Sequence, residues 1–369
     1  WKSSFGGGKG RGMIKERLRR LRAFLKAQGA DAVLINKEVN LHYFSGFRGD
    51  DTVLLISADK AILVTDFRYA EQARAQAPLF TLKEQTKGLW RQAVECVGEA
   101  GWKRLAFEGN ALFYSDYEKL QKLLPGAALD VPVDLSPLRM IKETEEIACI
   151  KKAVEIADAA FTDILTFIRP GVSENAVAAR LESTMRALGS ERPAFTTIVA
   201  SGKRGSLPHG VATEKLIVDG EFVTMDFGAV YQGYHSDMTR TICVGRADER
   251  QRAIYDIVLD AQRLGLAAVR PGVSGKAVDA VARQRLEAAG YGKYFGHGLG
   301  HSLGLEIHEE PRLSSASTCD SLAPNMLVTV EPGVYLPGWG GLRIEDTVLV
   351  TDTGGEPLTS SSKELIEIL

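Results

Sequence analysis

The first part of the chain alternates short apolar runs with amphipathic stretches, which is typical of an α/β domain. Apolar residues recur at helical spacing from Ile14 to Gln28 and predict a helix that Gly29 ends. Runs rich in aliphatic and β-branched residues predict strands at 32–35, 52–57, 61–65 and 104–107. Helical patterns predict helices at 67–76, 89–100 and 114–124, the last stopped by a Pro-Gly pair.

A segment with prolines near both ends, 132–137, predicts a linker after this domain. A long helical stretch over 138–168 follows, and its lysines and glutamates indicate a solvated face. We therefore expect a flexible leader over 1–12, a first domain over 13–133 and a second domain over 138–369. The leader lacks the apolar stretch of a secretory signal.

The first domain contains one histidine, His42, in a segment that we expect to form a loop, NLHYFSGF. One interpretation is a packing or surface histidine. The other is that the loop reaches an active site, in this subunit or in a neighbouring one. No group of residue types suited to catalysis stands out elsewhere in this domain.

An internal repeat organises the second domain. Residues 169–177 are RPGVSENAV and residues 270–278 are RPGVSGKAV. Each copy follows an apolar helical stretch and precedes another that ends near a glycine, Gly189 or Gly290. Such self-similarity predicts a duplicated α/β unit whose halves pack about a pseudo-twofold axis. A cleft between such halves is a natural ligand site.

A predicted hairpin over 222–244 places two carboxylates on one face of a sheet. A turn at its Gln-Gly pair sets Asp226 opposite either Asp237 or Thr239, and both registers stay open. Because side chains alternate along a strand, Asp237 shares the face of Asp226 in either case. Two like charges this close in a sheet are destabilising unless a cation lies between them.

The second half of the repeat supplies further groups that could complete a metal site. Two divalent cations would balance four carboxylates, and a histidine would add a neutral nitrogen. The candidates are Asp226, Asp237, His301, Glu331 and Glu345. Such ligands suit Mn²⁺, with Co²⁺ or Zn²⁺ as alternatives. Arg343 alternates onto the face of Glu345 and could hold the acidic cluster in place.

Composition and charge narrow the class of partner. The chain has 369 residues, 45% hydrophobic and 25% charged, in the range of a globular protein. A net charge of -2 argues against nucleic acid, and no apolar run is long enough for a membrane span. The four cysteines are scattered, which fits reduced thiols in the cytoplasm.

Taken in order, the motifs MDFG, SDMTRT, GHGLGH, EPG and RIED resemble those of the pita-bread metallopeptidases, which include methionine aminopeptidase, aminopeptidase P and prolidase. The resemblance covers essentially the whole chain from Met13. It implies a creatinase/prolidase-like N-terminal α/β domain followed by a pita-bread catalytic domain with an internal pseudo-twofold repeat.

The resemblance also implies a role for each candidate residue. The family's two-metal ligand order falls on Asp226, Asp237, His301, Glu331 and Glu345, and Glu331 would be the base. His209 in PHG and His308 in IHE would donate hydrogen bonds to the substrate carbonyl and the oxyanion, with His297 as a further cleft histidine. Phe195 and Ile198 would line the proline pocket, and Arg312 would hold the substrate carboxylate.

The implied activity is hydrolysis of the peptide bond before proline in small proline-containing peptides. Arg312 favours a dipeptidase, or prolidase, over an aminopeptidase P that acts on longer peptides. Methionine aminopeptidase is disfavoured because such enzymes generally lack a large N-terminal domain, and an inactive binding relative is disfavoured because all five ligands are present. The family suggests a homodimer with two divalent ions per subunit.

Overall fold

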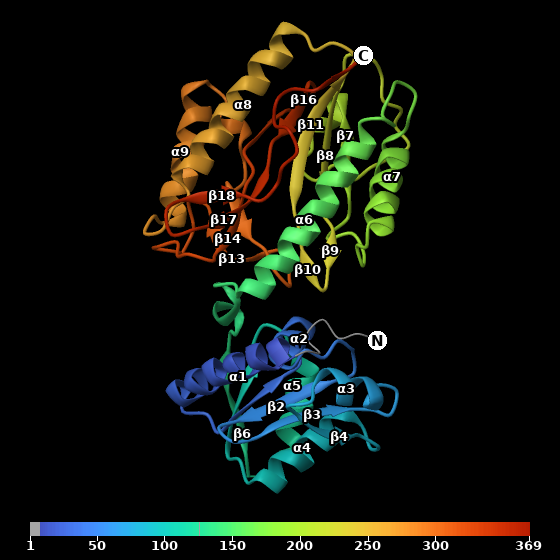
Figure 1. The fold of residues 1–369 in the computed structure, drawn as a ribbon. Coiled ribbons are helices and arrows are strands. Elements are labelled where there is room, and N and C mark those ends of the chain that lie inside the picture. Colours follow the sequence, from blue (N-terminus) through green and yellow to red (C-terminus); the bar gives the residue numbers. More distant parts are fainter. Residues whose placement is uncertain (1–7, 125) are drawn as a thin grey trace. The chain divides into compact units, whose positions relative to one another are not determined.

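The computed structural model describes residues 8–124 and 126–369, which form two compact units with a boundary between Leu138 and Arg139. Figure 1 shows both units as mixed helices and strands. Within these described residues, no helix has the length and apolar character needed to cross a membrane.

The first unit is built on a six-stranded mixed sheet in the order β4-β3-β2-β1-β5-β6. Strands β1 to β3 pair antiparallel, and the pairs β1–β5, β3–β4 and β5–β6 are parallel. The strands are β1 (Ala32–Ile35), β2 (Val53–Ser57), β3 (Ala61–Thr65), β4 (Thr81–Glu84), β5 (Arg104–Glu108) and β6 (Ala128–Val133). The helices are α1 (Gly8–Gln28), α2 (Glu38–Ser45), α3 (Ala70–Gln76), α4 (Leu89–Ala100) and α5 (Tyr114–Leu123), followed by the 3₁₀ turn η1 (Ser136–Arg139).

Two expectations for this unit are wrong in detail. Residues 8–12, expected in the leader, form the first turns of α1, and residues 1–7 lie outside the described part of the chain. Farther along the same helix, buried Arg17 donates to the sulfur of Met13 at 3.2 Å. His42 lies in helix α2 rather than in a loop and is 5% exposed, and its burial lowers its pKa well below the usual value.

The second unit contains two helix pairs and the strands between them. The helices are α6 (Thr144–Ile164), α7 (Glu174–Ala187), α8 (Glu249–Ala268) and α9 (Gly275–Ala288), with 3₁₀ turns η2 (Gly202–Ser206) and η3 (Gly292–Tyr294). In Figure 1, α8 and α9 lie at one side of the strands and α7 lies at the other. Each pair follows the arrangement that the repeat predicts, helix, turn and helix, before its strands.

The first half of this unit contributes a four-stranded sheet in the order β19-β11-β8-β7 and the hairpin extension β9–β10. The second half contributes the sheet β14-β17-β18 and the pairs β12–β13 and β15–β16. The strands of the first sheet and its extension are β7 (Ile198–Ser201), β8 (Phe222–Phe227), β9 (Val230–Tyr231), β10 (Tyr234–His235), β11 (Met238–Val244) and β19 (Glu367–Ile368). The others are β12 (Gly300–Ser302), β13 (Glu309–Leu313), β14 (Leu327–Val330), β15 (Gly333–Leu336), β16 (Gly340–Arg343), β17 (Asp346–Val350) and β18 (Gly355–Pro357).

Two apolar clusters pack the helices of this unit against its strands. One packs α6 and α7 against β7, β8 and β11, with Phe161, Leu181 and Met225 at most 2% exposed. The other packs α8 and α9 against β14 to β17, with Val258 and Val348 fully buried. Burial of such side chains stabilises the fold by about 1.5–3 kcal/mol each.

The long helix expected from residue 138 begins instead at Thr144. Glu143 and Glu146 form a capping box that fixes this start. The residues before Thr144 contact other parts of the unit instead, since Lys142 binds Glu309 at 2.9 Å in a buried ion pair. The charged residues of this segment therefore include buried side chains, such as Lys142 and Glu146, as well as a solvated face.

Candidate metal and peptide site

A cavity of about 1090 Å³ opens in the second unit, and every residue nominated from the sequence lines it. Those residues are Phe195, Ile198, His209, Asp226, Asp237, His297, His301, His308, Arg312, Glu331, Arg343 and Glu345. They come from strands and loops of both repeat halves. The cleft predicted between the halves is therefore present.

The hairpin adopts the second of the two expected registers, with Thr239 opposite Asp226. Its turn places both Gln232 and Gly233 at positive φ, as in the primed turns that suit a twisted hairpin. Alternation along β11 puts Asp237 and Thr239 on the face of Asp226. The opposite face carries the apolar residues that pack on α6 and α7.

The remaining acidic and imidazole groups arrive from the second half. His301 lies in β12, Glu331 directly follows β14, and Glu345 lies between β16 and β17. His301 Nε2 lies 3.5 Å from Asp237 Oδ2 and 3.4 Å from Glu331 Oε1. One ligand atom from each of Asp237, His301 and Glu345 lies within 4.8 Å of the others, an arrangement that can hold a metal ion.

Cations from the protein neutralise only part of this negative charge. Arg343 donates to Asp226 Oδ2 at 2.5 Å and lies 4.0 Å from Glu331. Asp226 Oδ1 and Glu345 Oε1 are buried and accept no hydrogen bond from the described residues. A buried carboxylate oxygen without a partner is costly, and a metal ion would satisfy both.

The pKa values of the carboxyl groups reflect the same crowding. Burial, reinforced by the neighbouring carboxylates, raises the pKa of Asp237 and of Glu345 well above their usual values. Burial raises the pKa of Glu331 to about 7, although Arg343 opposes the rise. Burial lowers the pKa of His301 to about 3, so its imidazole is neutral and its Nε2 can act as a ligand. The donor set fits divalent cations.

Three more histidines line the same cavity. The rings of His301 and His308 lie edge to face with centroids 4.4 Å apart. His297 contacts the Tyr335 hydroxyl at 2.9 Å, and Arg343 donates to that hydroxyl at 2.8 Å. Burial lowers the pKa of His297 to about 4 and also lowers the pKa of His308. Both imidazoles are therefore neutral at pH 7 and can donate one hydrogen bond each.

The expected substrate groups lie at the wall and rim. Phe195 and Ile198 supply apolar surface, and Arg312 pairs with His301 across β12 and β13. The Arg312 side chain is 43% exposed, and its closest carboxylate is Glu310 at 3.7 Å. Its guanidinium group therefore remains accessible to an anionic ligand.

The sequence did not predict the hydroxyl groups that donate hydrogen bonds to the candidate metal ligands. Thr239 donates to Glu345 Oε2 at 2.7 Å, and Thr329 donates to Glu331 Oε1 at 3.0 Å. Thr239 lies in the SDMTRT motif, where alternation along the strand could have found it. Tyr335 carried no comparable signal, because its partner His297 lies far away in the sequence.

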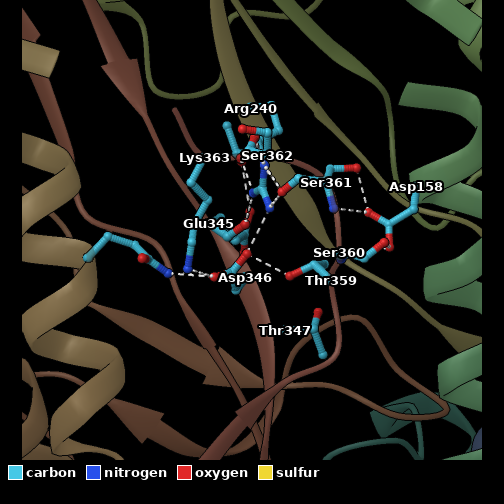
Figure 2. A network of polar contacts seen from close by, with 12 residues as sticks. Asp158, Arg240, Glu345, Asp346, Thr347, Thr359, Ser360, Ser361, Ser362 and Lys363 are labelled. Carbon is cyan, nitrogen blue, oxygen red and sulfur yellow. Dashed lines mark hydrogen bonds and ion pairs between the residues drawn. The ribbon is translucent and has the colours of Figure 1, made fainter. Parts of the chain in front are cut away.

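A buried charge network joins this site to the C-terminal segment (Figure 2). Arg240 donates to the carbonyls of Thr239 and Glu345 and binds Asp346 Oδ1 at 2.8 Å. Lys363 also binds Asp346, and Arg240 further donates to the Ser361 carbonyl at 2.9 Å. The main chain that carries Glu345 is thereby fixed from the side opposite the cavity.

Two known protein families match this chain. Residues 148–352 match metallopeptidase family M24, and residues 17–141 match the Creatinase/Prolidase N-terminal domain. An Xaa-Pro dipeptidase of Pyrococcus furiosus is 41% identical over 96% of this chain and 100% of its own length.

Two solved structures share the fold over nearly the whole chain. An Xaa-Pro dipeptidase from Bacillus anthracis superposes with a TM-score of 0.93 at 45% identity, covering 96% of this chain and 99% of that one. An X-Pro aminopeptidase from Thermotoga maritima superposes with a TM-score of 0.88 at 37% identity, covering 95% and 99%. The expected fold, with its N-terminal and pita-bread domains, is confirmed.

Proposed function

The chain belongs to metallopeptidase family M24, and from this premise we propose that it is a two-metal exopeptidase that hydrolyses Xaa-Pro bonds, with dipeptides favoured. One observation carries the proposal: four carboxylates and one neutral imidazole converge in the cavity, and two of the buried carboxylate oxygens accept no hydrogen bond from residues 8–124 and 126–369. Relatives named as Xaa-Pro dipeptidases over their full length support the substrate class.

Five residues would hold the two divalent cations: Asp226, Asp237, His301, Glu331 and Glu345. When bound, such a pair acidifies a water molecule and stabilises the negative charge that develops on a scissile carbonyl. Mn²⁺ is the first candidate because four of the five ligands are carboxylates, with Co²⁺ or Zn²⁺ as alternatives.

Proton transfer would fall to Glu331. Its carboxylate lies inside the cavity, with Oε1 3.4 Å from His301 Nε2, where it would accept the proton of a water molecule and return it to the leaving nitrogen. The proline nitrogen is a poor leaving group until it is protonated, so a positioned donor matters. His308, whose pKa is lowered by burial, and His209 would each donate a hydrogen bond to the developing oxyanion.

Substrate selection would rest on the wall and rim of the cavity. Phe195 and Ile198 supply apolar surface for a proline ring, and His297 would contact the bound peptide. Arg312 would pair with the free carboxylate of a dipeptide. The cavity volume of about 1090 Å³ favours a second candidate, an aminopeptidase P that accepts longer Xaa-Pro-Yaa peptides.

Paired peptide substrates test the proposal. Metal-depleted enzyme is assayed with Ala-Pro, Ala-Pro-Ala and Met-Ala-Ser after addition of Mn²⁺, Co²⁺ or Zn²⁺. We expect metal-dependent release of proline from Ala-Pro, faster than cleavage of the tripeptide. Equal or faster cleavage of the tripeptide would favour aminopeptidase P, whereas methionine release alone would refute both.

Glu331→Gln and His301→Ala supply matched controls. Both should abolish turnover and leave the circular dichroism spectrum unchanged, because both side chains line the cavity rather than the apolar clusters. Titration calorimetry should show two ions per wild-type chain. We also propose a cytoplasmic homodimer. Light scattering of purified protein tests the dimeric state.

A further inference from the structure

The loop that carries His209 is the starting point of an inference that rests on the proposed role of this histidine. The loop runs from 202 to 213 and contributes Ser206, Pro208, His209 and Val211 to the cavity. The His209 side chain is exposed, and within the described residues its carbonyl accepts from the Val211 amide at 2.9 Å. Its position is therefore set by the backbone of the loop.

One buried carboxylate fastens both ends of this loop. Glu174, at the start of α7, is 0% exposed. Its Oε1 accepts from the Ser201 amide at 2.8 Å and the Ser201 hydroxyl at 2.9 Å. Its Oε2 accepts from Arg204 Nε at 2.9 Å, the Thr213 amide at 3.2 Å and the Thr213 hydroxyl at 2.7 Å. Ser201 precedes the loop and Thr213 ends it, so Glu174 closes the loop at its base.

The loop is also held from the cavity side. Arg343 donates to the Pro208 carbonyl at 3.2 Å. A Cβ added at Gly205 would lie 2.8 Å from the Gly341 carbonyl, so the loop backbone packs directly on β16. Glu174 and Arg343 thus bind the loop at different positions, and His209 lies between Pro208, which Arg343 binds, and Thr213, which Glu174 binds.

The internal repeat shows that this carboxylate is specific to the first half. Both copies make the same backbone bonds: Gly171 and Gly272 donate to the carbonyls of Ile217 and Leu322, at 2.8 and 2.9 Å. Glu174 has Gly275 as its counterpart. There the helix start lies against the chain itself, since a Cβ would be 2.3 Å from the Arg312 carbonyl.

The duplicated turn therefore supports a cavity residue in each half by different means. In the second half, direct backbone packing supports Arg312. In the first half, the Asn175 amide donates to the Thr213 carbonyl at 2.9 Å, and the Glu174 side chain in addition binds Ser201 and Arg204 at the other end of the loop. We propose that Glu174 is a positioning residue that places His209 for transition-state stabilisation.

A double-mutant cycle tests the proposal. Glu174→Gln keeps the side-chain shape but replaces one acceptor oxygen with a donor, which faces donors from Ser201 or Thr213. We expect His209→Ala to lower kcat about a hundredfold and Glu174→Gln to lower kcat about tenfold with little change in KM. In the His209→Ala background, Glu174→Gln should have no further effect, because the two residues act in series.

A second readout does not depend on activity. Amide hydrogen exchange across 202–213 should be faster in Glu174→Gln, while the number of bound metal ions stays at the wild-type value. Thr213→Val removes a single hydroxyl bond to Glu174 and should give a smaller change in the same direction. This variant keeps the test available if Glu174→Gln folds poorly.

Asp163→Asn is the matched control. Asp163 in α6 binds Arg180 in α7 with two contacts of 2.7 Å and has no contact with the loop. It should lower stability without changing kcat. An equal loss from Glu174→Gln in both backgrounds, or wild-type kcat in the single variant, would refute the proposal. Full activity of His209→Ala would instead refute the role proposed for that histidine.

Discussion

The Glu331 carboxyl group shows how its surroundings determine the chemistry of one residue. It lies near His301, Arg343 and Thr329, and burial raises its pKa to about 7 from a usual value of 4.5. Burial and the neighbouring carboxylates also raise the pKa values of the Asp237 and Glu345 carboxyl groups well above their usual range. Without metal, these groups favour the protonated form in the folded chain.

This protonation predicts how stability depends on pH in the metal-free protein. A carboxyl group with a raised folded pKa contributes stability that is present below its unfolded pKa and is lost as pH rises through the folded pKa. His301, with its pKa lowered to about 3, acts in the opposite direction, but only below its unfolded pKa of 6.5. From pH 6.5 to 8.5 the free energy of unfolding should therefore fall as the pH rises.

Urea denaturation of the metal-free protein at several pH values measures this fall. Saturating Mn²⁺ should remove it, because the cations replace the protons. Glu331→Gln should reduce the slope near pH 7, since its amide does not titrate. A stability that rises with pH across this window would contradict the prediction.

Arg312 gives a second prediction for a single residue. Its guanidinium group is accessible at the rim, so it can pair with the carboxylate that only a dipeptide places next to the scissile bond. Arg312→Ala should raise KM for Ala-Pro about tenfold and should affect Ala-Pro-Ala less. Equal increases for both substrates in steady-state kinetics would exclude this role.

At the scale of elements, the segment after β18 helps to hold the strands that carry the candidate metal ligands. Asp158 in α6 accepts from Ser360 and Ser361, and Lys363 binds Asp346 at the start of β17 (Figure 2). Alternation along β11 turns Arg240 away from the cavity, toward this segment. One arginine therefore joins β11, β17 and the C-terminal residues.

Removing this arginine should destabilise the chain more than removing an exposed one. Arg240 and Asp346 form an ion pair in which both side chains are 1% exposed, so Arg240→Met should lower the free energy of unfolding by about 3 kcal/mol. Arg252→Met is the control, because the Arg252 side chain in the pair with Glu367 is 50% exposed and should cost under about 1 kcal/mol. Equal losses in guanidinium unfolding would contradict the buried pair's importance.

Elements differ in how far the sequence could predict them. The helices α4, α7 and α9 follow from periodic apolar positions and from stop signals such as Gly189. The start of α6 did not, because the charges of Lys142 and Glu146 look alike in sequence whether they are buried or solvated. The hairpin register also stayed open, since it depends on Gln232 adopting a positive φ, which side chains rarely do.

The candidate site was predictable because its residues stand in short motifs whose order is specific. The supporting contacts were not, since Arg240 with Ser361 and His297 with Tyr335 join distant segments without any periodic signal. Such contacts depend on how the folded chain packs, and the local sequence pattern does not indicate this packing.

At the scale of the molecule, all candidate metal ligands belong to the second unit, while the first unit has its own apolar cluster within 32–129. Metal removal should therefore speed amide hydrogen exchange in β8, β11, β12 and β14 to β17 by about tenfold or more, because ligand binding stabilises only the state that binds it. The strands β1 to β6 should exchange at unchanged rates. Mass spectrometry of the intact chain, with and without chelator, measures both, and uniform acceleration would contradict the prediction.

Because the candidate ligands are divided between the repeat halves, the ribosome makes them at different times. The ribosome releases Asp226 and Asp237 roughly a hundred residues before Glu345, which is on the order of 5–20 s of synthesis. During that interval the first half can form its hairpin, but no complete cage exists to retain a cation. In the proposed site, metal acquisition therefore waits for the second half, and a nascent chain that stalls before Glu331 lacks two of the five candidate ligands.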